Sequence, residues 1–213
     1  ASIDTESLTL ISYSSFNISK RKYLDTVLGY GEMDIDLIRQ VTGGQNEGNR
    51  KGRQFFGSVK YVLEPKELFS SKDISYYTRA DVGYTILEDY SETGNSTTAV
   101  HYNKQHIQNG SLSIGFNISG ETEINKTIVK PFMQFEFGGG ATNNSLSEAY
   151  YVTDSSTIYT HAISDKGTKH TQLTLGFEVK LKNNKTINLI YDRYDASENM
   201  FMNTLSINFR KTF

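Results

Sequence analysis

Cysteine and tryptophan are absent from these 213 residues, and proline occurs only twice. Without cysteine the chain can form no disulfide, no zinc ribbon and no thiol nucleophile. No run of 18 consecutive apolar residues occurs, so the sequence contains no candidate transmembrane helix. The net charge is −2 and Lys and Arg form no clusters, which argues against a nucleic-acid partner.

Apolar residues are present, but they occupy every second position, most clearly in residues 169–213. There the alternating apolar positions are Leu173, Leu175, Phe177, Val179 and Leu181. A period of two predicts a β-strand with one apolar and one polar face. Asn183 and Asn184 then predict a tight turn, and two further alternating segments end at Phe213. A chain that ends on an apolar strand residue is typical of an outer-membrane β-barrel, because the termini of soluble domains usually fray into water.

The same alternation predicts nine strands, at about residues 7–18, 23–39, 53–64, 74–90, 111–118, 129–137, 173–181, 187–191 and 205–213. Several have ten or more residues, and a tilted strand needs about 9–11 residues to cross a bilayer. We expect short or middling turns near residues 20, 69, 123 and 183. Long loops are expected near 47, where residues 41–52 form a polar stretch, near 98 and near 155. Short turns at one end and long loops at the other are typical of outer-membrane barrels. Residues 149–152 and 157–163 predict an extra β-arm in the last loop.

Charged residues alternate with the apolar ones along the predicted strands. The free-energy cost of exposing a charge to lipid indicates which face of each strand points outward to the membrane and which points inward. A Lys or Arg side chain that faces lipid at mid-depth costs about 2–4 kcal/mol. We therefore expect Leu, Phe and Val to point outward and the polar residues to line a wet lumen. The predicted lumen residues are Glu32, Asp34, Asp36, Lys60, Arg79, Asp81, Glu136 and Glu178.

Several segments match one family in order and spacing. They are residues 24–31 (LDTVLGYG) followed by Arg39, residues 77–84 (YTRADVGY) followed by 90–94 (YSETG), Pro131 at the start of an aromatic strand, and the ending 209–213 (FRKTF). With these the chain resembles the C-terminal translocator domain of autotransporters, the self-secreting (type V) proteins of the bacterial outer membrane. Two positions depart from the family pattern: Tyr76 stands where proline is usual and Phe209 where leucine is usual.

The resemblance implies an antiparallel up-and-down transmembrane β-barrel of twelve strands, of which about 9–10 are present. Residues 1–213 would be the C-terminal portion of one barrel domain, without its passenger, its linker helix and its first strands. The implied partners are the lipid bilayer with its lipopolysaccharide, the chain's own passenger and the barrel assembly machinery. Phe209 and Phe213 resemble the signal that this machinery reads.

Catalytic and metal chemistry has little support in the sequence. His101, His106, His161 and His170 stand apart from other ligands and are predicted to lie in solvated loops, since a metal site needs several convergent ligands. Glu32, Asp34 and Asp36 lack the twelve-residue calcium loop, and no G-x-S-x-G elbow or phosphate loop is present. We expect neither an enzyme nor a bound cofactor or metal.

The sequence predicts an outer-membrane barrel that anchors and exports an N-terminal passenger. Two alternatives remain open at this stage. One is a porin or small adhesion barrel without a passenger. The other is a soluble β-sandwich binding module, in which the apolar face would be buried between two sheets.

Overall fold

The computed structural model describes residues 1–65, 72–125, 127–143, 145–163, 168–181, 185–197 and 200–211, and within them almost every residue lies in a β-strand. The nine long strands are β1 (Ser2–Ser19), β2 (Lys22–Val41), β3 (Gly44–Leu63), β4 (Lys72–Leu87), β8 (Gln105–Gly120), β10 (Thr127–Thr142), β13 (Thr168–Leu181), β14 (Lys185–Ala196) and β15 (Met200–Lys211). No helix in the described part of the chain is long and apolar enough to cross a membrane.

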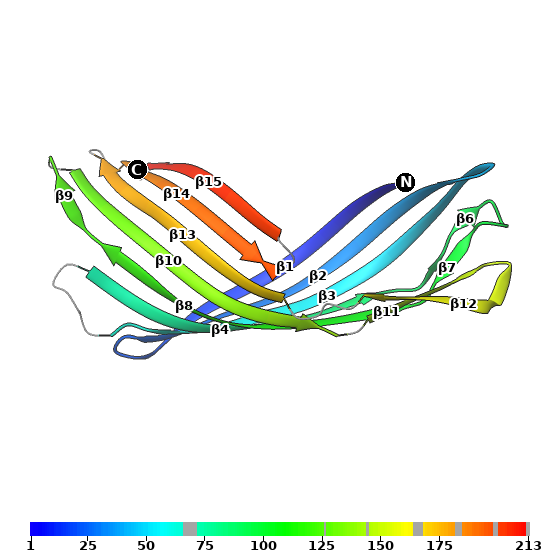
Figure 1. The fold of residues 1–213 in the computed structure, drawn as a ribbon, viewed down its shortest axis with the longest axis horizontal. Coiled ribbons are helices and arrows are strands. Elements are labelled where there is room, and N and C mark those ends of the chain that lie inside the picture. The colour runs from blue at the N-terminus through cyan, green and yellow to red at the C-terminus, as the bar shows by residue number, and fades with distance from the viewer. Residues whose placement is uncertain are drawn as a thin grey trace.

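The nine long strands form one antiparallel sheet in which sequence neighbours are spatial neighbours, in the order β1-β2-β3-β4-β8-β10-β13-β14-β15. The prediction of an antiparallel up-and-down arrangement is confirmed. Figure 1 shows the sheet bent into a trough. β1 and β15 form its two edges and are not paired with each other.

The β2–β3 connection differs from the sequence prediction. Residues 41–52 were predicted to be a polar loop, but both strands continue and Val41 pairs with Gly44. The two-residue turn is Thr42–Gly43, and glycine stands where φ is positive, at 89° for Gly43 in the turn and 151° for Gly44 at the start of β3, values that favour residues without a Cβ. The polar residues of this hairpin do not break the strands, because their backbone groups pair along the whole length.

The second, smaller sheet comes from two of the three connections that were predicted to be long, those near residues 98 and 155. It has the order β12-β11-β7-β5 and uses β5 (Tyr90–Ser91), β7 (Val100–Tyr102), β11 (Ser145–Tyr151) and β12 (Asp154–Ile163). The predicted β-arm at 149–152 and 157–163 is therefore present, as the β11–β12 hairpin. Two further short strands, β6 (Thr93–Gly94) and β9 (Thr122–Ile124), pair with β3 and β10. The turn at Asn183–Asn184 lies outside the described residues.

The curvature of the main sheet gives its two faces unequal exposure. Tyr77, Ser113 and Glu136 are 4%, 2% and 1% exposed, whereas Val82 and Leu112, on the other face, are 64% and 68% exposed. In the described part of the chain no second layer covers the middle of the sheet, so the side chains of the first face are shielded by one another as they converge on the concave side. We call this concave side the inner face and the opposite side the outer face.

Candidate functional site: the polar inner face

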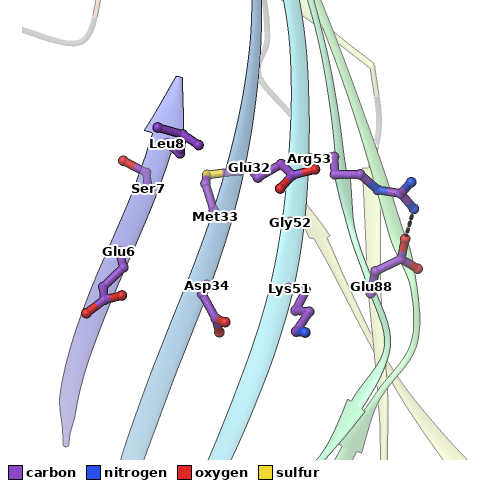
Figure 2. A pocket seen from close by; sticks show the side chains of 10 residues that line it. All are labelled: Glu6, Ser7, Leu8, Glu32, Met33, Asp34, Lys51, Gly52, Arg53 and Glu88. Carbon is purple, nitrogen blue, oxygen red and sulfur yellow. Dashed lines mark hydrogen bonds and ion pairs between the residues drawn. The ribbon is translucent and has the colours of Figure 1, made fainter. Parts of the chain in front are cut away.

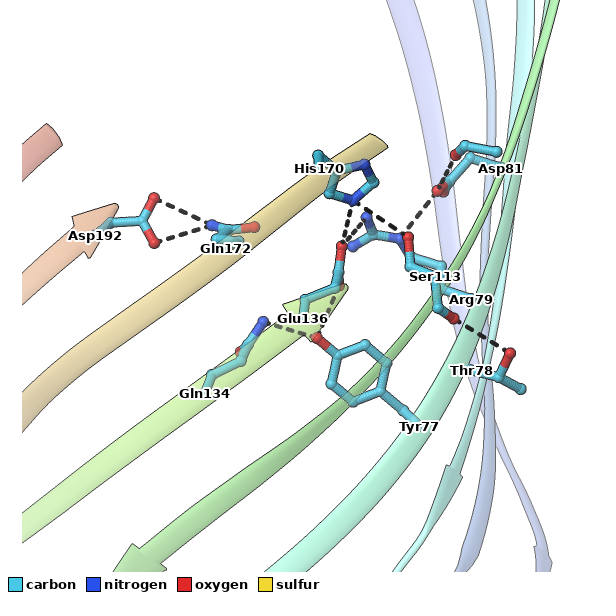
Figure 3. A network of polar contacts seen from close by, with 11 residues as sticks. Tyr77, Thr78, Arg79, Asp81, Ser113, Gln134, Glu136, His170, Gln172 and Asp192 are labelled. Atoms are coloured by element: carbon cyan, nitrogen blue, oxygen red, sulfur yellow. Dashed lines mark hydrogen bonds and ion pairs between the residues drawn. The ribbon is translucent and has the colours of Figure 1, made fainter. Parts of the chain in front are cut away.

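The inner face of the middle strands carries a connected polar network, shown in Figure 3. Its centre is Glu136 on β10, which accepts hydrogen bonds from Tyr77 Oη at 2.7 Å and from Arg79 Nη2 at 2.8 Å. His170 Nε2 lies 3.2 Å from the same carboxylate. A buried carboxylate is stable only when its charge is paired and its oxygens are hydrogen-bonded. Three strands thus meet at this one side chain.

The network extends to both sides of Glu136. Arg79 also contacts Asp81 at 3.0 Å, and Asp81 accepts a hydrogen bond from Ser111 at 3.1 Å. Lys60 Nζ lies 4.0 Å from the centre of the Tyr77 ring, within the range of a cation–π contact. The inner face therefore carries both signs of charge in alternation rather than a field of one sign.

Toward β14 the polar row continues with amide and carboxylate groups. Gln134 donates a hydrogen bond to Tyr77 Oη at 3.1 Å, and Gln172 donates to Asp192 at 2.9 Å. Thr174 donates to the same carboxylate at 2.6 Å. Nearer the end of the sheet that carries the short turns, Glu178 lies 3.9 Å from Arg210.

Glycines on the inner face make room for these large polar groups. A Cβ at Gly115 would lie 2.4 Å from the Tyr77 ring, and one at Gly138 would lie 2.4 Å from Ser113 Oγ and 2.5 Å from the His170 ring. Small residues alternate here with Tyr77 and His170, so the network fits within the curvature of the sheet. The sequence GGG at 138–140 is thus part of a strand and not a loop opening.

The structure brings together Lys60, Arg79, Asp81, Glu136 and Glu178, which all occupy inner-face positions of the register. It does not bring Glu32, Asp34 and Asp36 to that face, and their assignment to the lumen is wrong. In β2 these three residues continue the outer-face series of Leu28 and Tyr30, because the pairing of β2 with β3 has no bulge. Met33, Ile35 and Leu37, predicted to point outward, lie on the inner face instead.

Sequence reasoning missed the role of His170. It was expected in a solvated loop, but it lies on β13 opposite Gly138 with 11% of its side chain exposed. The other three histidines also lie on strands, His101 on β7, His106 on β8 and His161 on β12. The sequence position of His170 does indicate its face, because His170, Gln172 and Thr174 are polar residues at every second position of the same strand. Among the described residues no group of three or more His, Cys, Asp or Glu side chains is arranged to hold a metal ion.

The outer face of the same strands is apolar. Its rows run across the sheet in register, for example Leu28, Gly57, Val82 and Gly110, and in the next row Tyr30, Phe55, Tyr84 and Gln108. Phe209 on β15 belongs to this face and is 63% exposed. Phe213 lies outside the described residues.

Beyond Tyr30 the strands β1, β2 and β3 continue as an extension whose outer face is charged (Figure 2). Side chains of both signs line a recess of about 500 Å³ there, including Glu6, Asp34 and Lys51. Asp34 and Asp36 are bridged by the amide of Asn49, which lies 2.9 Å from Asp36. Each acidic residue of β1 stands opposite another on β2, Asp4 opposite Asp36 and Glu6 opposite Asp34.

The segment between β5 and β7, strands of the second sheet, is tied to the inner side of this extension through Glu92. Arg39 donates to Glu92 from Nε at 2.9 Å and from Nη2 at 2.5 Å, and the fully buried Asn46 donates to Glu92 at 3.3 Å. Burial of Glu92 opposes its ionisation, but the hydrogen bonds from Arg39 and from the Val100 amide outweigh burial and hold the pKa of the Glu92 carboxyl below its ordinary value. Glu92 is therefore an ionised anchor at neutral pH.

Aromatic packing completes this attachment. Tyr90 and Tyr102 stack with ring centroids 5.0 Å apart, and the Arg50 guanidinium lies 5.6 Å from the Tyr90 centroid. A Cβ at Gly48 would lie 2.5 Å from the Tyr90 ring, so glycine at this position lets the ring approach β3.

Comparison with known proteins assigns the sheet to a family. A family model described as the autotransporter beta-domain matches residues 1–192. The chain is similar to the beta domain of the Bordetella autotransporter BrkA, with a TM-score of 0.64 and 14% identity over 99% of this chain and 75% of that one. It also matches the ferric citrate transporter FecA, with a TM-score of 0.49 and 11% identity over 96% of this chain and 32% of that one. No curated protein sequence matches. The chain belongs to the autotransporter beta-domain family, and its sheet is a β-barrel wall of the bacterial outer membrane.

Proposed function

We propose that this chain is an autotransporter translocator, which anchors an N-terminal passenger in the outer membrane and provides the route by which the passenger reaches the cell surface. The observation that carries the proposal is the separation of polarity across one layer of strands. The inner face holds Lys60, Arg79 and Glu136 around a wet interior, and the outer face holds an apolar belt. Backbone hydrogen bonds between neighbouring strands satisfy the backbone within the bilayer.

The proposed mechanism is non-catalytic. A polypeptide that passes along the inner face meets side chains of both signs that are already paired with one another, so no single charge holds it tightly. The network at Glu136 keeps the wall rigid while the passenger moves. We expect neither a cofactor nor a nucleic-acid partner to take part.

The membrane orientation follows from the connections. The turn between β1 and β2 and the turn between β2 and β3 each have two residues, so their lengths do not distinguish the two ends of the sheet. The second sheet does distinguish them, because it lies at the end that carries the β2–β3 turn. In outer-membrane barrels the longer connections are extracellular and the short turns periplasmic. The second sheet and the β1–β3 extension would therefore face outward from the cell.

The test is surface display of the full-length protein on intact cells, followed with an antibody against the passenger's N-terminal region. We expect display by the wild type, and retained insertion with at least tenfold lower display for the inner-face variant Arg79→Glu, because a reversed charge leaves Glu136 facing another carboxylate. The outer-extension variant Arg53→Glu serves as the matched control. Equal display by both variants, or a gene that encodes no passenger, would favour the porin or adhesion alternative.

Assembly is the second part of the proposal. β15 pairs with β14 on one side and, within the described residues, with no strand on its other side, and such an edge can add onto another sheet. We propose that the outward Phe209, together with Phe213, is read by the barrel assembly machinery. Deletion of Phe213 is expected to impair insertion. Normal insertion of both the deletion and Phe209→Ser would contradict this part alone.

A further inference from the structure

The second sheet has a long free edge that lies outside the barrel wall. The main sheet ends at β1 and β15, and these are the edges that closure of a barrel removes. The second sheet ends at β5, which has two residues, and at β12, which has ten. Within the described residues β12 pairs only with β11, so its other side is an edge that closure of the barrel does not cover.

β12 is also exposed on both of its faces. Figure 1 shows the β11–β12 hairpin projecting at one end of the molecule, and residues 154–162 are all exposed. Ile158 and Tyr159, which point to opposite faces of the strand, are each 55% exposed, and Leu146 on β11 is 50% exposed. Exposed apolar side chains beside a free strand edge mark an interaction surface.

The sequence of β12 lacks the residues that normally keep a strand edge from pairing. Natural edge strands are commonly protected by charged side chains or by proline. Residues 155–163 (SSTIYTHAI) contain no Asp, Glu, Lys, Arg or Pro. Asp154 lies at the hairpin turn, where its carboxylate accepts hydrogen bonds from Ser156 at 2.6 Å and from Thr157 at 2.9 Å. The edge beyond the turn is therefore free of acidic side chains.

Such an edge is complementary to a second copy of itself. Two antiparallel β12 strands can be related by a two-fold axis beside Thr160. Ile158 of each copy then lies opposite Ala162 of the other. Tyr159 lies opposite His161, so no charged side chain meets its own equivalent, an arrangement that would be destabilising.

The edges of the main sheet do not have this property. β1 carries Asp4 and Glu6, and β15 carries Arg210 and Lys211. Pairing of either strand with its own copy would bring like charges together. The absence of charge is thus specific to the edge that the barrel wall leaves free.

We propose that β12 is a self-association site, at which it pairs antiparallel with β12 of a second copy and joins the two second sheets into one. The contact goes beyond passenger export and does not rest on it. One pair of strands buries less surface than the roughly 1,600 Å² of a standard interface, so the association is reversible and depends on protein concentration. In the proposed orientation the edge lies on the extracellular side, where two copies of the protein meet.

The test is a cysteine scan of the full-length protein in detergent, with any cysteine outside the scanned positions replaced by serine. Single cysteines are placed in turn at positions 158–162, which are all exposed, and oxidised. A disulfide requires Cα atoms about 4.4–6.8 Å apart, and two positions from the axis the equivalent residues are already roughly 14 Å apart along the strands.

We expect one maximum of disulfide-linked dimer, at position 160, about fivefold above positions 158 and 162 because the yield falls with distance from the axis. A cysteine at Ser147, on β11, is the control, since β12 of both copies separates it from its equivalent. A single maximum at another scanned position would support the proposal in a different register. Equal yields at all positions would indicate random collision, and no dimer at any position would indicate an edge that is bare or covered by a segment such as the passenger. Either result would overturn the proposal.

A charge on the edge provides an independent test. Thr160→Lys places like charges at the two-fold axis, and the dimer fraction measured by light scattering at a fixed protein concentration should fall about threefold. The matched control is Ser96→Lys, an exposed position in the turn between β6 and β7, and heat-modifiable migration shows that both variants retain the barrel. An unchanged dimer fraction in Thr160→Lys would overturn the proposal even where passenger display is normal. Loss of display with an unchanged wild-type dimer would count against passenger export alone.

Discussion

The outer face of β2 has opposite polarity in two regions of the molecule, the wall and the extension. In the wall it shows Leu24, Leu28 and Tyr30, and in the extension it shows Glu32, Asp34 and Asp36. No bulge intervenes, so the same face passes from lipid into water within a single strand. The alternation of polar and apolar residues therefore shows which side chains share a face of a strand. It does not show whether that face meets lipid or water unless the position of the residues relative to the bilayer is also known.

The inner face reverses in the same way. In the wall it holds the polar network around Glu136, whereas in the extension it holds Met33, Ile35 and Leu37, with the second sheet attached on that side through Arg39, Arg50 and Gly48. Each region buries what its surroundings cannot solvate. In the proposed orientation, the extension above the bilayer buries apolar side chains, and the wall within the bilayer buries charged ones.

The largest difference in stability is expected between a charge placed on the outer face of the wall and one placed on the outer face of the extension. Leu112→Arg, in the wall, should lower the free energy of unfolding in a bilayer by about 2–4 kcal/mol. Leu8→Arg, in the extension beside Glu32, should change it by less than about 0.5 kcal/mol. Urea unfolding in vesicles measures both. Similar losses for the two variants would remove the distinction between wall and extension.

The next largest effect should come from the inner network. Glu136→Ala leaves Arg79 without its buried partner, and because Arg79 keeps about a third of its surface in water, we expect a loss of about 2–3 kcal/mol. Arg193→Gln removes the exposed pair with Asp195 and should cost much less, because solvent screens an exposed ion pair. Heat-modifiable migration on a gel ranks the two. Greater loss for Arg193→Gln would contradict the central role of Glu136.

A pH-dependent effect is expected at the contact between Arg39 of the extension and Glu92. The pKa of Glu92 is held below its ordinary value, so the contribution of the Arg39–Glu92 contact is complete above about pH 4.3, the ordinary pKa of glutamate, and is lost as the pH falls through the lowered value. The protection factors of the amides at residues 93–100, which compare the measured exchange rate with the intrinsic rate at the same pH, should therefore fall in acid. In Glu92→Gln these protection factors should be low at all pH values. An acid-insensitive wild type would contradict the assignment.

The smallest effect concerns the opposed carboxylates of β1 and β2. Glu6→Gln relieves repulsion from Asp34 and should stabilise the protein by about 0.2–0.5 kcal/mol at low salt, and by less at high salt because exposed charges are screened. Ser7→Ala, an exposed position on the other face of β1, provides the control. If Glu6→Gln destabilised the protein at low salt, the Glu6 carboxylate would be engaged in a favourable interaction rather than repelled by Asp34.

Much of the fold was predictable from alternation alone. The nine strands, their antiparallel order and the β11–β12 arm followed from period-two patterns and turn residues. The β2–β3 hairpin could not be predicted in this way, because its residues from Gly44 to Gly52 are polar or glycine and show no alternation with apolar residues. They form a strand because their backbone pairs with that of β2. The faces of Arg79 and Glu136 were predictable because apolar residues flank them, whereas those of Glu32 to Asp36 depended on where the bilayer ends.

The most direct test of the two outer-face environments uses the absence of cysteine from these 213 residues, with any cysteine elsewhere in the full-length protein replaced by serine. Single cysteines are introduced on the outer face of β2 at Leu28 and at Asp34 in the full-length protein, and intact cells are treated with a charged maleimide that cannot cross the outer membrane. The account predicts labelling at position 34 and none at 28, where a fluorophore attached before reconstitution should instead be quenched by a lipid-borne nitroxide. Labelling at 28 with quenching at 34 would contradict it, because the outer face of the wall would then be the wet one.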